Sequence, residues 1–366
     1  MAIRKRPTSA DVARLAGVSR TTVSFVLNDH PTAQISRATR DRVQAAALEL
    51  GYSPNASARR LAVGASLILG LVLRQRPEQV AVDALLPETL RGLAAAAREG
   101  GYRILVEPLP PGDHSYSTLL RAHHVDGLVV SGPRGDDAAL AELLADGFPV
   151  VLQGFLPDTP IPSVDVDNVS GARLAVEHLI AAGHREIACI TNAALAYTAA
   201  TERLEGYRSA LGGAGIPFDD RLVTQADFDA ASGHAAMDRL IRRGCRMSAV
   251  FAASDVVALG VIGAARAHHI RVPEQLAIVG FDDIPLAANF DPPLTTVHLP
   301  AYELGFSVGR ALMDRIAGRP VPVRSVLETQ LVVRGSSPGP HGGEAGGKPP
   351  AKLVRAMPAR SEVGPA

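Results

Sequence analysis

Three charged side chains lie where a parallel α/β sheet would present them to a ligand. Arg203, Asp255 and Asp282 each begin or end an element just after an apolar stretch that predicts a strand. Ligands of such sheets bind at the carboxyl ends of the strands. Two carboxylates and one guanidinium suit a polyhydroxyl molecule, because its neighbouring donors and acceptors can pair with bidentate groups. We therefore expect these residues to contact a small molecule.

Each of the three residues also has a purely structural interpretation. Arg203 can form a salt bridge that holds its own lobe together. Asp255 can cap the helix that begins there, and Asp282 can be an acid in a turn. The residue types alone leave both interpretations open.

A second group of residues is suited to nucleic acid. Arg20, Thr21 and Thr22 occupy the first turn of a short helix, which follows another short helix and a glycine turn. In a helix-turn-helix protein this second helix enters the major groove of DNA. There an arginine can pair with guanine, and a threonine can bond a base edge or pack its methyl group on thymine.

Phosphate contacts are expected from the same region. Ser24, Asn28 and Arg40 are better placed for the DNA backbone, where contacts fix position without reading sequence. The alternative is a three-helix domain that binds another protein.

No group of residues predicts catalysis. Gly260 and Gly263 lie inside an expected helix, not in a phosphate-binding loop between a strand and a helix. The histidine pairs at 123–124 and 268–269 are adjacent and cannot share one helical face, which makes them poor metal ligands. We therefore expect no catalytic residue, no metal site and no cofactor, and a protein that is not an enzyme.

Capping residues mark the elements that would position the nucleic-acid group. Thr8 and Asp11 have the spacing of a capping box, Gly17 ends the first helix, and Ser19 and Ser36 cap the second and third. Apolar residues recur at helical spacing and predict a three-helix core, formed by Val12, Leu15, Ala16, Val23, Val26, Leu27, Val43, Ala47 and Leu50.

The rest of the chain alternates short β-rich stretches with amphipathic helices. This alternation predicts two doubly wound parallel sheets, one in each of two lobes that face each other across a cleft. The strands are expected at 67–73, 102–106, 127–131, 150–153, 187–191, 221–225, 249–252 and 277–281. The helices are expected at 87–99, 116–124, 137–145, 170–182, 203–212, 230–243 and 255–268.

Charge is unevenly spread along a chain of 366 residues whose formal net charge is zero. Residues 1–61 carry ten Arg and Lys against four Asp and Glu, a net charge of +6, so the remainder carries −6. A basic N-terminal part on an acidic body suggests a polyanionic partner for the basic part alone. Cys189 and Cys245 are the two cysteines, and their apolar neighbours predict buried free thiols in a reducing compartment.

The predicted organisation has four parts. Residues 1–54 form an all-α helix-turn-helix domain, 55–66 a hinge helix and linker, and 67–335 the two-lobed body; residues 336–366 form a disordered tail rich in Gly and Pro. The tail lacks leucine heptads that could assemble a tetramer, so a dimer is expected. No apolar stretch predicts a secretion signal or a membrane span, and we expect a cytoplasmic protein.

Several motifs occur in a fixed order near the N-terminus. They are DVARLAGVS at 11–19, TVS at 22–24, VLN at 26–28, LGYSPN at 50–55 and ARRL at 58–61. This series resembles the lactose-repressor (LacI/GalR) family of bacterial regulators. Phe25 departs from the family pattern, which usually has a guanine-reading arginine here. Phenylalanine cannot donate a hydrogen bond, so it can meet a thymine methyl group, pack inward or read nothing.

The resemblance implies a hinge that becomes ordered only when two copies meet on DNA. Residues 55–61 are too few for a stable isolated helix. Ala58 and Leu61 would enter the minor groove, and Leu61 matches a leucine that wedges into a central base step. Unstacking that step costs about a few kcal/mol, offset by the contacts that bent DNA permits. Such wedging requires a dimer and a palindromic operator. The alternative is that Leu61 only fills the linker.

The body also resembles this family, in shorter motifs at 163–168, 203–207, 253–255, 280–283 and 292–297. The resemblance implies that Arg203, Asp255 and Asp282 contact an effector and that Phe228 stacks on it. It also implies three crossings between the lobes, near 162, 291 and 322, with the run 319–333 returning to the second lobe. The turn at 74–78 lacks the aromatic common in sugar-responsive members and adds charge to one cleft wall.

Taken together, these features predict a dimeric, DNA-binding transcriptional repressor with a palindromic operator. A small molecule in the cleft, a sugar or sugar derivative, would alter its operator affinity. A phosphorylated, acidic or non-sugar effector stays open, as does the choice between inducer and corepressor. The competing classes are a solute-binding receptor with the same body, which the basic N-terminal part argues against, and an enzyme on the same scaffold.

Overall fold

The computed structural model describes residues 7–27, 35–52, 65–113, 116, 125–137, 139–140, 143 and 147–337. The chain divides into two compact units, Met1–Leu67 and Ile68–Ala366, which are treated separately below. Asn28, Ala58 and Leu61 lie outside the described residues, as do most of the hinge, residues 338–366 of the tail and most of the two helices expected at 116–124 and 137–145. The predictions on those segments stay predictions. Ser336 and Ser337 are buried and hydrogen-bonded, so the prediction of disorder is wrong for these two residues.

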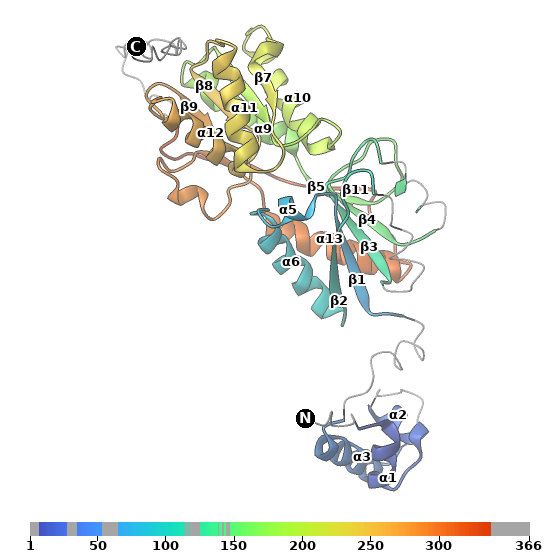
Figure 1. The fold of residues 1–366 in the computed structure, drawn as a ribbon. Coiled ribbons are helices and arrows are strands. Elements are labelled where there is room, and N and C mark those ends of the chain that lie inside the picture. The colour runs from blue at the N-terminus through green and yellow to red at the C-terminus, as the bar shows by residue number, and fades with distance from the viewer. Residues whose placement is uncertain are drawn as a thin grey trace, which may run out of the picture. The chain divides into compact units, whose positions relative to one another are not determined.

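The described residues of the first unit form three helices, α1 (Ser9–Ala16), α2 (Arg20–Leu27) and α3 (Arg37–Leu50) (Figure 1). The predicted capping box is present at α1, because the Asp11 carboxylate accepts from the Thr8 backbone N–H at 2.9 Å and the Thr8 hydroxyl accepts from Asp11 N–H at 3.4 Å. The hydroxyl oxygens of Ser19 and Ser36 accept from Thr22 N–H and Thr39 N–H in the same way.

The helices of this unit enclose a small core of valines and alanines. The prediction for Leu15 was wrong, since its side chain is 47% exposed. The space at the centre is filled instead by smaller residues that let the helices approach closely. The buried core residues are Val12, Ala13, Ala16, Val23, Val26, Val43, Ala46 and Ala47.

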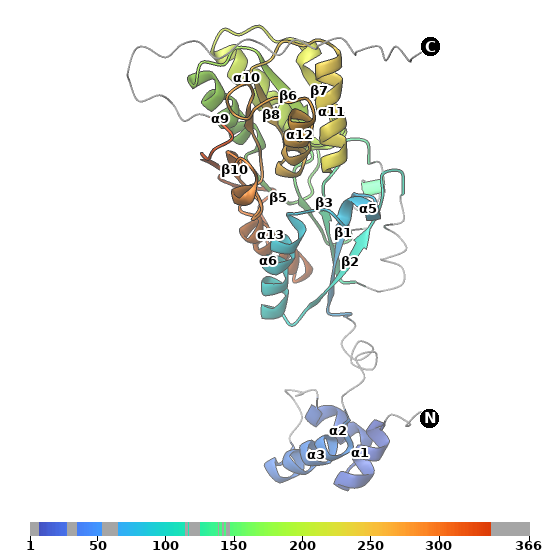
Figure 2. The same ribbon diagram turned by 60° about the vertical axis from the view of Figure 1, so that its left-hand side comes forward.

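The second unit contains the two predicted parallel sheets (Figures 1 and 2). The first sheet has the strand order β11-β5-β4-β3-β1-β2 and the second has the order β7-β6-β8-β9. The strands of the first sheet are β1 (Ile68–Leu73), β2 (Arg103–Pro108), β3 (Gly127–Ser131), β4 (Val150–Gln153), β5 (Ser163–Val166) and β11 (Arg324–Leu327). Those of the second are β6 (Ile187–Thr191), β7 (Val223–Gln225), β8 (Ala249–Ala252) and β9 (Ala277–Val279).

Among the described residues, helices cover one face of the first sheet and both faces of the second. In the first lobe α6 (Leu86–Glu99) packs beside α13 (Ala301–Ile316), and the short helix α5 (Pro77–Val80) follows β1 (Figure 1). In the second lobe α9 (Asn168–Ala181) and α10 (Thr198–Gly213) lie on one face of the sheet. Helices α11 (Ala230–Arg242) and α12 (Asp255–Ala267) lie on the other face (Figure 2). None of the described helices is long and apolar enough to cross a bilayer.

Alternation along the strands explains this layering. Ile187 and Cys189 of β6 pack toward α9 and α10, whereas Ala188 and Ile190 pack toward α11 and α12. Successive side chains of a strand point to opposite faces, so a strand covered on both faces is apolar throughout. Cys189 is buried as predicted, but Cys245 is only partly buried, and both thiols are free.

The chain crosses between the lobes later than predicted. The first crossing lies between β5 and α9, and the second between β10 (Thr296–His298) and α13. The third lies between β11 and β12 (Gln330–Val332), which pairs antiparallel with β10. The predicted return of the whole run 319–333 to the second lobe is therefore wrong, because β11 still belongs to the first sheet. The helix α13 was not predicted.

Glycines set the distance between α6 and α13. A Cβ atom added at Gly305 would lie 2.1 Å from the Thr89 carbonyl oxygen, and one added at Gly92 would lie 2.0 Å from the Tyr302 carbonyl oxygen. Each helix thus places a glycine against the backbone of the other. Since α6 and α13 come from distant parts of the chain, this contact joins the start and the end of the first lobe.

We predict that Gly305→Ala lowers the free energy of unfolding by about 1–3 kcal/mol, because the added methyl group must push two backbones apart. Gly212→Ala is a matched control, since a Cβ there meets no atom within 4 Å. It should leave stability unchanged or raise it by about 0.4–1 kcal/mol. Denaturant unfolding of the full chain measures both, and equal stability of the two variants would contradict the close packing.

Candidate functional site

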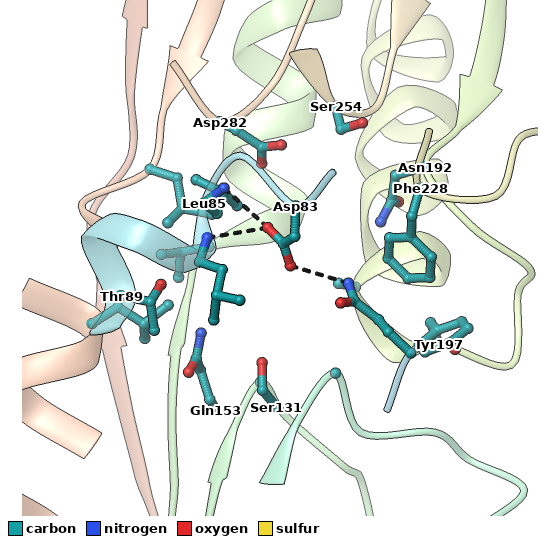
Figure 3. A pocket seen from close by; sticks show the side chains of 18 of the residues that line it. Asp83, Leu85, Thr89, Ser131, Gln153, Asn192, Tyr197, Phe228, Ser254 and Asp282 are labelled. Carbon is teal, nitrogen blue, oxygen red and sulfur yellow. Dashed lines mark hydrogen bonds between the residues drawn. The ribbon is translucent and has the colours of Figure 1, made fainter. Parts of the chain in front are cut away.

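A cavity of about 170 Å³ lies between the two lobes of the second unit (Figure 3). Its lining comes from the carboxyl ends of strands in both sheets and from the loops that follow them. The polar lining side chains include Gln75, Asp83, Ser131, Gln153 and Asp165 of the first lobe and Asn168, Asn192, Tyr197, Thr198, Arg203, Ser254 and Asp282 of the second.

Arg203 is held by several partners at once. Its Nε donates to Asn168 Oδ1 at 2.9 Å, and its Nη1 donates to the Ala253 carbonyl oxygen at 2.6 Å and to Asp282 Oδ1 at 3.2 Å. The guanidinium carbon also lies 3.8 Å from the centre of the Phe281 ring. The predicted cavity contact and the alternative salt bridge therefore coexist at this residue, which lines the cavity while it pairs with Asp282.

Asp282 follows β9 and has an unusual backbone conformation, with a φ of 116°. A non-glycine residue in this region costs on the order of 1–3 kcal/mol, and such residues gather at functional sites. Its backbone N–H donates to the Val297 carbonyl oxygen, which ties it to β10 and to the second crossing. Burial raises the pKa of its carboxyl group, and the neighbouring Arg203 opposes that rise.

Phe228 lines the second-lobe side of the cavity and also has a positive φ, of 64°. Its ring meets the Tyr197 ring edge-on, with the ring centres 4.9 Å apart. The Tyr197 hydroxyl donates to the Arg74 carbonyl oxygen of the first lobe at 2.6 Å. Both rings therefore belong to the second lobe, and one hydrogen bond ties them to the first; Phe228 is the one of the two that was named from the sequence.

Asp255 lies beneath the lining instead of on it. Its carboxylate accepts from Thr296 Oγ1 at 2.5 Å and from Ile284 N–H at 2.9 Å, and its side chain is fully buried. The residues on either side, Ser254 and Val256, do line the cavity. The structure thus places Arg203, Phe228 and Asp282 together and sets Asp255 behind them as a support for the loop after β9.

The turn at 74–78 was predicted to add charge to the cavity wall, but its two arginines are directed elsewhere. Arg74 is buried inside the first lobe, with its Nε 3.1 Å from Asp137 Oδ2. Arg76 forms an ion pair with Asp227 of the second lobe at 2.6 Å. Gln75, between them, is the residue of this turn that lines the cavity.

Three amide side chains of the lining were not identified from the sequence. Gln75, Gln153 and Asn192 each have a buried amide oxygen with no hydrogen-bond partner among the described residues. An unpaired buried polar atom costs about 1–3 kcal/mol, so a ligand that supplies donors here gains by pairing it. The three residues are far apart in sequence, and no sequence signal marks them as neighbours.

The exposed face of α2 carries residues predicted to contact DNA. Arg20, Thr21 and Ser24 are exposed, and Phe25 is 36% exposed. Thr22 is partly buried, and its hydroxyl lies 2.9 Å from Ser19 Oγ, where it also supports the start of the helix. Phe25 therefore points outward with the polar residues instead of packing inside the core.

Arg40 lies elsewhere in the first unit, near the start of α3, and is partly buried. Among the described residues no group of three or more His, Cys, Asp or Glu side chains is placed to hold a metal ion. The two candidate sites are therefore the outer face of α2 and the interlobe cavity.

Two family models match the chain. Residues 8–55 match "Bacterial regulatory proteins, lacI family", which covers the three-helix unit. Residues 176–337 match "Periplasmic binding protein-like domain", which covers most of the second lobe and the second and third crossings.

Characterised relatives match over nearly their whole length. The HTH-type transcriptional regulator CelR of Thermobifida fusca is 40% identical over 339 residues, which cover 91% of this chain and 99% of the relative. The HTH-type transcriptional repressor CytR of Escherichia coli (strain K12) is 34% identical over 345 residues, with 92% and 99% covered.

Solved structures agree with these relatives. A CelR–cellobiose complex superimposes with a TM-score of 0.70 and 38% identity over 90% of this chain and 100% of that one. The Lac repressor dimer bound to operator and the anti-inducer ONPF superimposes with a TM-score of 0.81 and 30% identity over 91% and 99%. The chain belongs to the lacI family of bacterial regulatory proteins and is a DNA-binding transcriptional regulator.

Proposed function

We propose that this protein is a homodimeric, cytoplasmic repressor without enzymatic activity, which binds a palindromic operator. In this proposal α2 of each copy enters the major groove and Leu61 of each copy wedges into the central base step. A neutral sugar-like molecule in the interlobe cavity changes the operator affinity.

The class of effector is inferred from polar atoms of the cavity lining that have no hydrogen-bond partner. Three amide oxygens without a partner, on Gln75, Gln153 and Asn192, come from both lobes and surround one cavity. Sugar hydroxyl groups donate and accept at short spacing, which is what such a lining needs. The Phe228 and Tyr197 rings add an apolar surface for the faces of a sugar ring. CelR, which is similar over its full length, has been solved as a complex with cellobiose.

The route from cavity to DNA runs through the crossings. Asn168, which accepts a hydrogen bond from Arg203, is the first residue after the first crossing, and its Nδ2 reaches both Asp165 of β5 and Glu202 of α10. A ligand that engages Arg203 and Asp282 therefore acts on segments that join the lobes. A coupling of about 1–3 kcal/mol between the two sites is typical, and it acts equally in both directions.

We predict that Asp282→Ala abolishes the response to effector while operator binding is retained, because the cavity loses its Arg203-paired acceptor and the α2 face is untouched. A panel of neutral sugars (cellobiose, maltose, glucose and galactose) is screened by calorimetry, and the binder is then added in operator titrations. Asp220→Ala, which removes an exposed acid of the same lobe, should respond like the unchanged protein. A full response in the Asp282 variant would remove this residue from the site.

We predict that Leu61→Ala weakens specific operator binding, since the wedge that bends the duplex is lost, and leaves salt-dependent non-specific binding largely intact. Leu48→Ala is the matched control, because Leu48 of α3 is 85% exposed in the same unit. Fluorescence titrations with operator and with random duplex, at several salt concentrations, measure both. An equal loss on the two DNAs would contradict the wedge.

The operator itself is testable by selection from random duplex DNA. We expect a palindrome with a flexible central step, as two α2 helices and two wedges require. The Phe25→Arg variant should select guanine at one added position of each half-site, with a discrimination of about 1–3 kcal/mol per position. Identical selected sequences from the two proteins would mean that residue 25 does not face the bases, and a non-palindromic sequence would contradict the dimer.

A further inference from the structure

Asp83 is a further carboxylate of the cavity lining, in addition to Asp165 and Asp282. It lies in the loop between α5 and α6 and lines the cavity from the first lobe, as Asp282 does from the second (Figure 3). Its Oδ1 accepts from the backbone N–H groups of Leu85 and Leu86 at 3.0 and 3.1 Å. Its Oδ2 accepts from Gln75 Nε2 at 3.2 Å.

These three bonds hold the Asp83 carboxylate in place without neutralising it. The donors are two backbone amides and one side-chain amide, and none is a cation. The arginines closest in sequence are directed to other acids, since Arg74 pairs with Asp137 and Arg76 pairs with Asp227. Burial raises the pKa of Asp83, and its three hydrogen bonds oppose that rise.

The charge of the lining is consequently one-sided. Its charged residues among those described are three acids, Asp83, Asp165 and Asp282, and one base, Arg203. Arg203 is already paired with Asp282. The charge on Asp83 is also among the causes that raise the pKa of Asp282, as expected for acids that face each other. An anionic ligand would add a further negative charge to this enclosure.

We propose that Asp83 is a second effector-binding carboxylate, which accepts from a hydroxyl group of a neutral polyol that Asp282 holds from the other lobe, and that it excludes phosphorylated and carboxylated sugars. This inference rests on the proposed effector class and sharpens it. The effector bridges two acids on opposite lobes, so it replaces a repulsion across the cavity with hydrogen bonds to both walls. Gln75 positions Asp83 and is at the same time one of the lining amides with an unpaired oxygen.

The test compares the full-length protein with its Asp83→Asn and Glu78→Gln variants. Glu78→Gln removes the same charge from the exposed surface of α5, outside the lining. Calorimetry with cellobiose, maltose, glucose and galactose identifies the neutral sugar that binds. The anionic counterpart is the uronate of that sugar, in which a carboxylate replaces a hydroxymethyl group. Asp83→Asn should weaken the binding of the neutral sugar by roughly 10- to 100-fold, because a hydrogen bond to a charged acceptor is lost.

The unchanged protein should bind the uronate much more weakly than the neutral sugar. Asp83→Asn should reduce this difference between the two affinities. Glu78→Gln should change neither affinity. Equal binding of sugar and uronate by the unchanged protein, or equal effects of the two variants, would overturn the role of Asp83 while leaving the effector class intact. If no neutral sugar binds the unchanged protein, the effector class itself fails and this inference falls with it.

A ligand-free measurement separates these outcomes from a folding defect. The raised pKa of Asp83 means that the folded protein loses stability as the pH rises through that pKa, and Asp83→Asn removes this loss. Asp83→Asn should therefore raise the melting temperature more at pH 8 than near pH 4, which is close to the ordinary pKa of an aspartate. The effects of Asp83→Asn and Asp282→Asn should also be non-additive at pH 8, since either change relieves the same repulsion. Additive effects would show that the two acids do not face each other.

Discussion

The buried guanidinium of Arg203 is the interaction on which the cavity depends. A buried charge is tolerated only when it is paired and fully hydrogen-bonded. Arg203 meets that condition by drawing together the start of α9, the end of β8 and the end of β9, through Asn168, Ala253 and Asp282. These segments are far apart in sequence, so one side chain fixes the floor of the cavity.

The same interaction links the cavity to the joints of the body. Asn168 is adjacent to the first crossing, and Asp282 is tied through its backbone to β10, from which the chain enters the second crossing. Residues that would touch an effector are thus bonded to the segments about which the lobes can move. Since the backbone strain at Asp282 persists only while its surroundings hold it, the loop after β9 is a natural place for a bound molecule to act.

The two units differ in the charge of their candidate sites. The N-terminal part is basic, and an exposed arginine and two exposed hydroxyl residues lie on α2, as suits a polyanionic partner. The cavity of the body has more acids than bases among its described lining residues, and its unpaired amides accept donors. The two candidate sites therefore differ in charge: the outer face of α2 carries a base, and the described lining of the cavity carries more acids than bases.

Local pattern determined the elements of this protein, and long-range packing decided its site. Capping residues and period-2 or period-3.6 spacing are properties of neighbours in sequence, so the helices of the first unit and most strands of both sheets could be predicted from Thr8, Ser19, Ser36 and the apolar stretches. Helix α13 was not predicted, and the three crossings were predicted too early in the chain, because these residues are assigned to a lobe only by contacts with α6 and β5. Arg203, Phe228 and Asp282 were reached through strand ends and family motifs, whereas Asp255 proved to lie behind the lining and Asp83 was missed. The sequence does not show whether a carboxylate caps a loop, lies beneath the lining of a cavity or faces a ligand. Only the contacts that it makes in the folded chain decide between these roles.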